Sequence, residues 1–266
     1  MRYLLLLSLC FLVACQSKTA PSFSTFSSFD GTQIAFSDEG EGKVVFLIHG
    51  FINTRKNWDK SALKDSLLAA GYRVIAPDLR GNGDSEHPRE PQAYANDAEV
   101  KDLIALADHL TLTQFDVVGY SRGSIVLAKW LTQEKRILKA VIGGMGLDFS
   151  DPNWDRRIMF AQAFGGEAEL NDITEGAVQY AQSIERDLHI LSLQQHHQPV
   201  TTVEELRSLQ TPILVIAGDQ DHDNGEPSEL SAELLNGHLK IVPGDHNNAY
   251  KSEAFAKEIM YFLKNL

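Results

Sequence analysis

The sequence contains almost no cysteine. Both cysteines, Cys10 and Cys15, lie near the N-terminus, and residues 16–266 have none. The body of the protein therefore has no disulfide, no cysteine nucleophile and no thiolate metal site, so its stability must come from a hydrophobic core. At 266 residues the chain can bury a sizeable core, as one large α/β domain with a small insertion.

Clusters of positive charge are also absent. The formal net charge is −12, and lysine and arginine form no run anywhere in the chain. Phosphate binding needs clustered lysine and arginine, so we do not expect a nucleic acid partner.

Histidine patterns typical of metal sites are scarce as well. No His-Glu-x-x-His stretch is present, and the adjacent His196 and His197 have no carboxylate at ligand spacing. We expect this pair to lie on a solvated surface, with metal binding as the less favoured alternative. The sequence therefore predicts neither a metal nor an organic cofactor.

The apolar run at the N-terminus is too short to span a bilayer. It follows a positive start at Arg2 and ends at Cys15, which is typical of a secretory signal peptide. Its last residues, Leu12-Val-Ala-Cys15, resemble the bacterial lipobox. This resemblance implies cleavage before Cys15 and lipid attachment to that residue, which would hold the protein on a membrane surface.

The residue after Cys15 bears on the destination of the exported protein. An Asp there would suggest retention in the inner membrane, whereas this chain has Gln16, so the outer membrane of the cell envelope is favoured. Ordinary signal cleavage near Ala14 or Ala20 and an uncleaved anchor are the alternatives.

The rest of the chain alternates strand and helix patterns. Apolar and β-branched runs predict strands, and apolar residues at helical spacing predict helices between them. The pattern begins with a hairpin over 23–36 and continues with strands over 43–48, 73–77, 115–118, 138–142, 211–217 and 239–242, and helices over 57–70, 96–110, 124–131, 228–235 and 252–266. This alternation predicts an α/β fold with a mostly parallel sheet and helices on both faces.

The alternation is interrupted between Leu147 and about Gln210. Two or three helical patterns follow one another there without a strand, which predicts a small helical cap. The expected organisation is a signal peptide (1–14), a lipidated N-terminus and tether (15–24), the first part of the core (25–146), the cap (147–210) and the second part of the core (211–266).

The stretch with the strongest chemical signal is Gly119-Tyr-Ser-Arg-Gly123. It follows the strand at 115–118 and leads directly into a helix, which is the context of a nucleophile elbow. A turn this sharp strains the apex residue and lifts the Ser121 side chain clear of the sheet. A Cβ at Gly119 or Gly123 would collide with neighbouring backbone. Alone, the motif is weak, because glycine and serine are common in turns.

Two later segments supply the partners that a serine nucleophile needs. The strand at 211–217 ends in Gly218-Asp-Gln-Asp221, and the strand at 239–242 ends in Pro243-Gly-Asp-His246. Carboxyl ends of parallel strands meet at one edge of the sheet, so these segments should converge on the elbow.

Together these motifs resemble the α/β-hydrolase superfamily over nearly all of the chain after the N-terminal segment. The matching stretches are His49-Gly-Phe51, Gly119-Tyr-Ser-Arg-Gly123, Gly218-Asp-Gln-Asp221 and Gly244-Asp-His246, in the order and elements that the family uses. The resemblance implies the α/β-hydrolase fold.

The resemblance also implies roles for five residues. Ser121 would be the nucleophile, His246 the general base and then acid, and Asp221 the residue that orients the imidazole. The backbone N–H groups of Phe51 and Arg122 would form the oxyanion hole.

The acidic member of the triad is the assignment with the most alternatives. The family's Gly-x-x-Asp spacing from Gly218 favours Asp221, while Asp219, Asp223 and Asp148 remain alternatives. Asp245, adjacent to His246, is expected to be a turn residue, and His49 is expected to be structural.

The predicted activity is cleavage of carboxylic esters, with a small ester or acyl compound as substrate. Other chemistry on the same fold, such as C–C bond hydrolysis, perhydrolysis or aminopeptidase action, is the alternative. A serine at the apex disfavours the branches that attack haloalkanes or epoxides with a carboxylate. A non-catalytic envelope binding protein is a further alternative from a different class.

Overall fold

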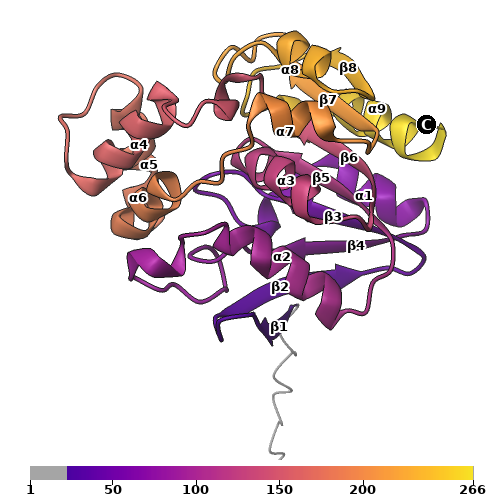
Figure 1. Ribbon diagram of the computed structural model, residues 1–266, viewed down its shortest axis with the longest axis horizontal. Coiled ribbons are helices and arrows are strands. Elements are labelled where there is room, and N and C mark those ends of the chain that lie inside the picture. The colour runs from indigo at the N-terminus through magenta and orange to yellow at the C-terminus, as the bar shows by residue number, and fades with distance from the viewer. Residues whose placement is uncertain (1–22, 266) are drawn as a thin grey trace, which may run out of the picture.

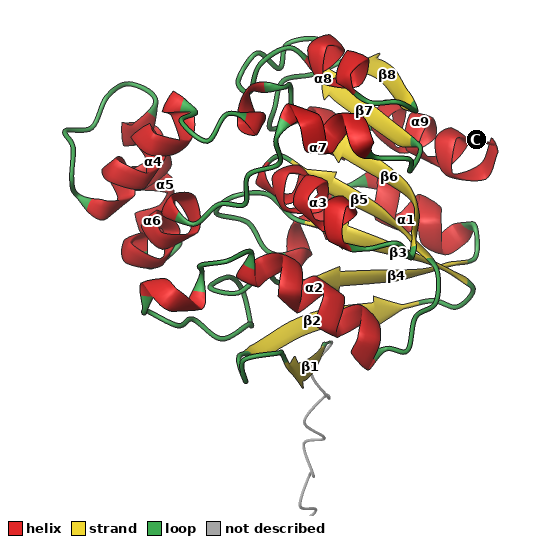
Figure 2. Cartoon of the chain, viewed as in Figure 1, coloured by secondary structure: helices red, strands yellow, loops and turns green. Residues whose placement is uncertain are grey.

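A computed structural model describes residues 23–265 of the chain. An eight-stranded sheet runs through this part of the protein, with helices on both faces, and a group of helices projects to one side of it (Figures 1 and 2). The strands are β1 (Ser24–Ser27), β2 (Gln33–Glu39), β3 (Lys43–Ile48), β4 (Tyr72–Pro77), β5 (Phe115–Tyr120), β6 (Ile137–Gly143), β7 (Ile213–Gly218) and β8 (Gly237–Val242). The predicted fold class is confirmed.

The strand order is β1-β2-β4-β3-β5-β6-β7-β8. The first two strands form the predicted hairpin, and β2 pairs antiparallel with β4, while all other neighbours are parallel. The central strands are buried along their whole length, because helices cover both of their faces. Because β3, β5, β6, β7 and β8 run parallel, the carboxyl ends of β3, β5, β7 and β8 lie at the same edge of the sheet.

Alternating residues of the central strands enter two separate cores. On one face Phe46 and Ile48 of β3 pack with α2 (Ala98–His109), α3 (Arg122–Gln133), α7 (Val203–Ser208) and α8 (Pro227–Glu233). On the other face Val45 and Leu47 pack with α1 (Ala62–Ala69) and α9 (Glu253–Asn265). The two-residue period of the strand produces this division.

The projecting group consists of α4 (Asp155–Gly165), α5 (Thr174–Ser183) and α6 (Leu188–His196), and we refer to it as the cap (Figure 1). Phe164, Val178 and Leu191, one from each cap helix, share a small apolar cluster with Ile52 from the loop after β3. The cap is thus attached through the loop that follows β3. Helix α7 belongs to the core and begins with a capping box formed by Thr202 and Glu205.

Several predicted boundaries differ from the observed ones. The helix predicted over 57–70 is two pieces, a 3-10 helix η1 (Arg55–Lys60) and α1, because the Ser61 side chain caps α1 by accepting a hydrogen bond from the amide of Leu63. Three further short 3-10 helices are η2 (Pro91–Ala93), η3 (Asp148–Ser150) and η4 (Ala249–Lys251).

The predictions about the N-terminal segment lie outside the described residues. The signal peptide over 1–14, lipidation of Cys15 and most of the tether over 15–24 belong to this group. Between residues 23 and 265, no helix is long and apolar enough to cross a membrane.

Candidate active site

Ser121 stands at a sharp junction between β5 and α3. Its backbone has φ 52° and ψ −128°, a conformation that side-chain-bearing residues rarely adopt. Strain of this kind costs about 1–3 kcal/mol, and the surrounding structure has to hold it. The Ser121 amide donates to Gly143 O at 2.8 Å, and the Ser124 amide donates to Ser121 O at 2.8 Å. These bonds fix the apex with its hydroxyl outside the sheet.

The glycines on either side of Ser121 allow this junction. A Cβ on Gly119 would lie 2.7 Å from Gly123 O, and a Cβ on Gly123 would overlap the carbonyl oxygen of Ile48. Real Cβ atoms do not approach backbone this closely, so the sequence-based reason for these two glycines is confirmed.

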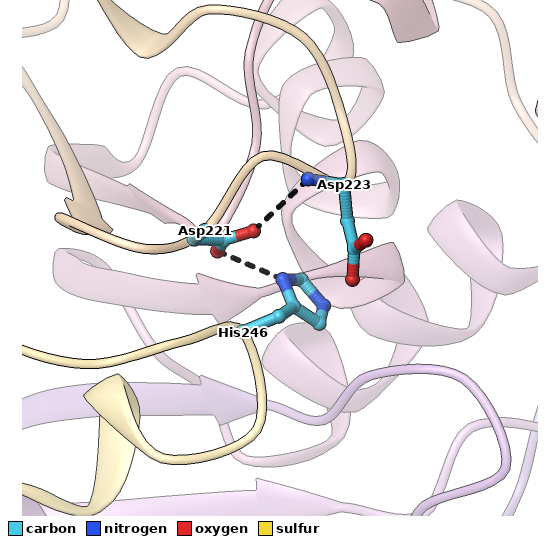
Figure 3. Close-up of side chains that lie close together, drawn as sticks. All are labelled: Asp221, Asp223 and His246. Carbon is cyan, nitrogen blue, oxygen red and sulfur yellow. Dashed lines mark hydrogen bonds and ion pairs between the residues drawn. The ribbon is translucent and has the colours of Figure 1, made fainter.

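The Ser121, His246 and Asp221 side chains form a hydrogen-bonded line. The Ser121 Oγ lies 2.9 Å from His246 Nε2, and His246 Nδ1 lies 2.8 Å from Asp221 Oδ2. The carboxylate can only accept, so we assign the proton of the neutral ring to Nδ1, which leaves Nε2 free to accept from the serine hydroxyl. Figure 3 shows the imidazole pointing at Asp221. The structure thus brings together the three residues predicted to form the triad.

The loops that carry Asp221 and His246 are joined through their backbones. The Asp219 amide donates to Val242 O at 2.8 Å, and the Gln220 amide donates to Gly244 O at 3.1 Å. In return, the Gly244 amide donates to Asp219 Oδ1 at 2.9 Å. Asp219, an alternative for the triad acid, therefore bonds the histidine loop and does not contact the imidazole. The structure favours Asp221.

The other two acidic residues near the motifs, Asp148 and Asp245, have different positions. Asp148 lies in η3 and packs against Gly225. Asp245 is exposed and accepts hydrogen bonds from the Asn247 amide and from Asn248, as expected of a turn residue.

Asp223, the third aspartate of the turn after β7, is a neighbour of the triad. Its carboxylate lies beside the imidazole in Figure 3, and the ligand atoms of Asp221, Asp223 and His246 lie within 4.8 Å of one another. Such a group could bind a cation. The 2.8 Å bond between His246 Nδ1 and Asp221 Oδ2 already accounts for two of its members, so we interpret the cluster as part of the triad. The Asp223 side chain is half exposed.

Tyr120 and Asn224 both contact His246. The Tyr120 hydroxyl donates to the carbonyl oxygen of His246 at 2.8 Å. Burial, with a further contribution from the nearby Asp221 carboxylate, raises the pKa of Tyr120, so the hydroxyl stays a neutral donor. Asn224 donates to Gly144 O at 3.1 Å and lies 3.5 Å from His246 Nδ1. The sequence carried no signal for these roles beyond Tyr120's place in the elbow motif.

The two amides predicted to form the oxyanion hole flank the serine. Arg122 is the first residue of α3, so its N–H has no partner within the helix. Phe51 follows Gly50, whose Cα approaches Ser121 so closely that a Cβ there would lie 3.2 Å from the serine Cβ. Within residues 23–265 neither amide donates to a protein acceptor. Both are available to an oxyanion next to Ser121 Oγ.

The Arg122 side chain does not enter the cavity as a free cation. Its guanidinium donates to Glu99 Oε1 at 2.8 Å and to Glu99 Oε2 at 2.7 Å, with both side chains almost fully buried. It also donates to Gln194 O of cap helix α6 at 2.8 Å. The residue therefore connects the elbow to α2 and to the cap. Nothing in the sequence identified Glu99, because it meets Arg122 only when the folded chain places α2 beside the start of α3.

His49 has the structural role expected of it. It is buried, and its Nε2 accepts from the Leu79 amide at 3.0 Å while Nδ1 donates to Gly50 O at 2.8 Å. Burial lowers the pKa of His49, which keeps the ring neutral. This hydrogen-bonding pattern holds the loop that leads to Phe51.

The His196–His197 pair lies at the end of α6. His196 Nε2 is 3.7 Å from Glu167 Oε1, and burial is the main reason that the pKa of His197 is lowered. Among the described residues, the pair is not part of a cluster of three potential metal ligands.

A cavity of about 590 Å³ lies between the triad and the cap. Ser121 and His246 line it from the core, Phe51 and Ile52 from the loop after β3, and Trp154 and Phe160 from the cap. Phe51 packs edge-on against Phe164 of α4, with ring centroids 5.3 Å apart. A molecule that reaches the Ser121 hydroxyl therefore contacts cap residues as well.

Comparison with known proteins identifies the fold. Residues 43–165 match the family model described as alpha/beta hydrolase fold. Among solved structures, the esterase EaEST from Exiguobacterium antarcticum superposes with a TM-score of 0.76 at 18% identity, covering 91% of this chain and 99% of that one. At this level of identity the likeness concerns the fold.

Two curated relatives illustrate the range of activities on this fold. A non-heme haloperoxidase from Rhodococcus erythropolis is 28% identical over 254 residues, which cover 81% of this chain and 89% of that protein. Epoxide hydrolase 3 from Siraitia grosvenorii is 37% identical over 97 residues, which cover 36% of this chain and only 30% of that protein.

Proposed function

We propose that this chain, which has the α/β-hydrolase fold, is a serine hydrolase that cleaves carboxylic esters through an acyl-enzyme intermediate. The observation that supports this most directly is the line of hydrogen bonds from Ser121 Oγ through His246 to Asp221, at 2.9 and 2.8 Å. An epoxide hydrolase activity is disfavoured, because a serine stands where that chemistry uses a carboxylate.

The proposed reaction has two halves. His246 Nε2 accepts the Ser121 proton as Oγ attacks the ester carbonyl carbon, and the Phe51 and Arg122 amides stabilise the oxyanion. The protonated imidazole then gives its proton to the departing alcohol. In the second half His246 takes a proton from water as the water oxygen attacks the acyl carbon. The bond between the acyl carbon and Ser121 Oγ then breaks, His246 returns the proton to Oγ, and the carboxylic acid leaves.

Labelling with a fluorophosphonate and hydrolysis of nitrophenyl esters test this proposal. We expect the wild-type protein to be labelled and to hydrolyse at least one short or medium ester. Ser121→Ala should abolish labelling and lower kcat by about 10⁶-fold, as removal of a triad serine does elsewhere. Ser183→Ala, at an exposed serine of the cap, is the control. A folded wild-type protein that resists labelling would contradict the proposal and favour the non-catalytic binding role.

Perhydrolysis is a second candidate, because a relative that spans most of the chain is named a haloperoxidase. The same acyl-enzyme would then be attacked by hydrogen peroxide in place of water, which yields a peracid and free Ser121. Ester turnover measured with and without peroxide, with peracid-dependent halogenation as the readout, distinguishes the two. Serine labelling without any ester hydrolysis would favour C–C bond hydrolysis or aminopeptidase action.

We also propose that the protein is a lipoprotein of the bacterial cell envelope, anchored through Cys15 and residing in the outer membrane. The lipobox-like residues before Cys15 support this. Growth with a clickable palmitate analogue should label the wild type and not Cys15→Ser, while Cys10→Ser serves as the matched control. Equal labelling of both variants would contradict the anchor and leave the enzymatic proposal untouched.

A further inference from the structure

The lining of the cavity is basic although the protein as a whole is acidic. The chain carries 24 lysine and arginine residues against 36 acidic ones. The cavity wall reverses this balance, because it contains one acidic residue and five basic ones: Asp223 against Lys60, Arg122, Arg156, Arg157 and Lys251. Such a local reversal attracts anions into the cavity.

Two of the five cations have acidic partners. The Arg122 guanidinium is neutralised by Glu99 through two hydrogen bonds. Arg156 Nη2 lies 3.7 Å from Asp223 Oδ2, and the Arg156 guanidinium lies over the Phe160 ring at 5.1 Å. These contacts use the single acidic residue of the wall.

Arg157 has no ion-pair partner of this kind, although the Asp151 carboxylate is near enough to favour its charged form. Within residues 23–265 no carboxylate forms an ion pair with it, and its Nη2 donates only to the carbonyl oxygen of Pro152. Its Nε is buried without an acceptor. Burial lowers the pKa of Arg157, although a guanidinium still carries its charge at neutral pH. A partly desolvated cation with an unused donor is stabilised when an anion binds beside it.

Lys60 and Lys251 add to the positive field of the cavity wall. In the part of the chain that the structure describes, neither forms an ion pair, and the Lys251 ammonium lies over the Tyr250 ring at 5.4 Å. Both lysines come from segments that flank the core side of the cavity, η1 and η4, whereas Arg157 comes from the cap. Positive groups thus face the cavity from both sides.

We propose that Arg157 recognises a carboxylate on the substrate, so that the natural substrate is an ester with a second, ionised acidic group. The forked guanidinium matches the two oxygens of a carboxylate. This inference rests on the proposed esterase function. It concerns the part of the substrate that does not react.

A matched pair of substrates tests the inference. The 4-nitrophenyl monoester of adipic acid and 4-nitrophenyl hexanoate have the same acyl length and differ at the far end, which is a carboxylate in one and a methyl group in the other. We expect the full-length wild-type protein to have the higher kcat/KM for the adipate monoester. Arg157→Met should lower that value about 10- to 100-fold and change the hexanoate value less than about threefold. Arg157→Lys should restore part of the loss.

The controls separate this inference from the enzymatic proposal. Arg186→Met replaces a cap arginine that is not part of the cavity wall and should leave both values unchanged. Added salt should raise KM for the adipate monoester and not for the hexanoate. Hydrolysis of the hexanoate that depends on Ser121, without preference for the adipate monoester or with equal losses in Arg157→Met, would overturn the inference alone. Failure of Ser121→Ala to affect either ester would overturn the esterase proposal.

Discussion

At the residue scale, the two neighbouring carboxylates Asp221 and Asp223 should contribute very differently to the reaction. Asp221 is almost fully buried and accepts from His246 Nδ1, while Asp223 is half exposed. Asp221→Asn would put an amide where a carboxylate must fix the ring tautomer, so we expect kcat to fall about 10⁴-fold. Asp223→Asn, the matched variant, should cost less than about tenfold. Steady-state kinetics of both variants with one ester measures the two falls in kcat. A larger fall for Asp223→Asn than for Asp221→Asn would mean that the triad acid has been assigned wrongly.

His49 makes stability depend on pH. Burial lowers its folded-state pKa below the ordinary value of 6.5, so the unfolded chain binds this proton at a higher pH than the folded protein does. The folded state is favoured fully above pH 6.5 and loses stability as the pH falls below it, by at most about 1.4 kcal/mol per pH unit for one group. Urea unfolding between pH 7.5 and 5.5 should show a shallower slope for His49→Gln. An unchanged slope would argue against a buried neutral imidazole.

The residues of the site differ in how well the sequence could predict them. Ser121 and His246 follow strands and lie two residues from a glycine, so local pattern was sufficient to propose them. Glu99 and Arg157 occur within ordinary helical patterns. Their roles depend on partners distant in the chain, which a single sequence does not reveal.

At the scale of elements, the Glu99–Arg122 pair connects α2, the start of α3 and, through Gln194 O, the cap helix α6. Glu99→Gln would leave the buried guanidinium without its counter-charge, so we expect a loss of about 3–5 kcal/mol in the free energy of unfolding. The amide of Arg122 should also shift, which can lower kcat/KM up to about 100-fold. Chemical denaturation and ester kinetics measure the two effects.

The control for this prediction is Glu233→Gln, which breaks a surface ion pair with Arg207. We expect no measurable change there, because solvent and salt screen exposed pairs. If both glutamine variants were equally stable, the buried pair would contribute no more than a surface one.

Element types were predicted better than element ends. The buried strands have continuous apolar runs, so their positions followed from the sequence. The division between η1 and α1 did not, since it depends on Ser61 acting as a cap in the folded chain. In the same way, the helical run over 147–210 indicated a cap, but the separation of α7 from it depends on contacts with α3 and α8.

At the scale of the whole molecule, the cap should be the first part to be cut by a protease. The loop over 166–173 between α4 and α5 is exposed along its whole length and contains Glu167 and Glu169. Brief digestion with a glutamate-specific protease should therefore cleave there before the core is attacked. Mass spectrometry of the first fragments identifies the site. First cuts within the core helices would contradict the view of the cap as a peripheral unit.

The joined loops after β7 and β8 have a practical consequence. Gly218 and Gly244 approach so closely that no side chain fits between them, and each loop donates hydrogen bonds to the other. Lengthening either turn would displace both Asp221 and His246 from Ser121, because the two loops are bonded to each other. An engineer who wants this scaffold to accept a new compound should therefore diversify the cap helices and keep both turns unedited.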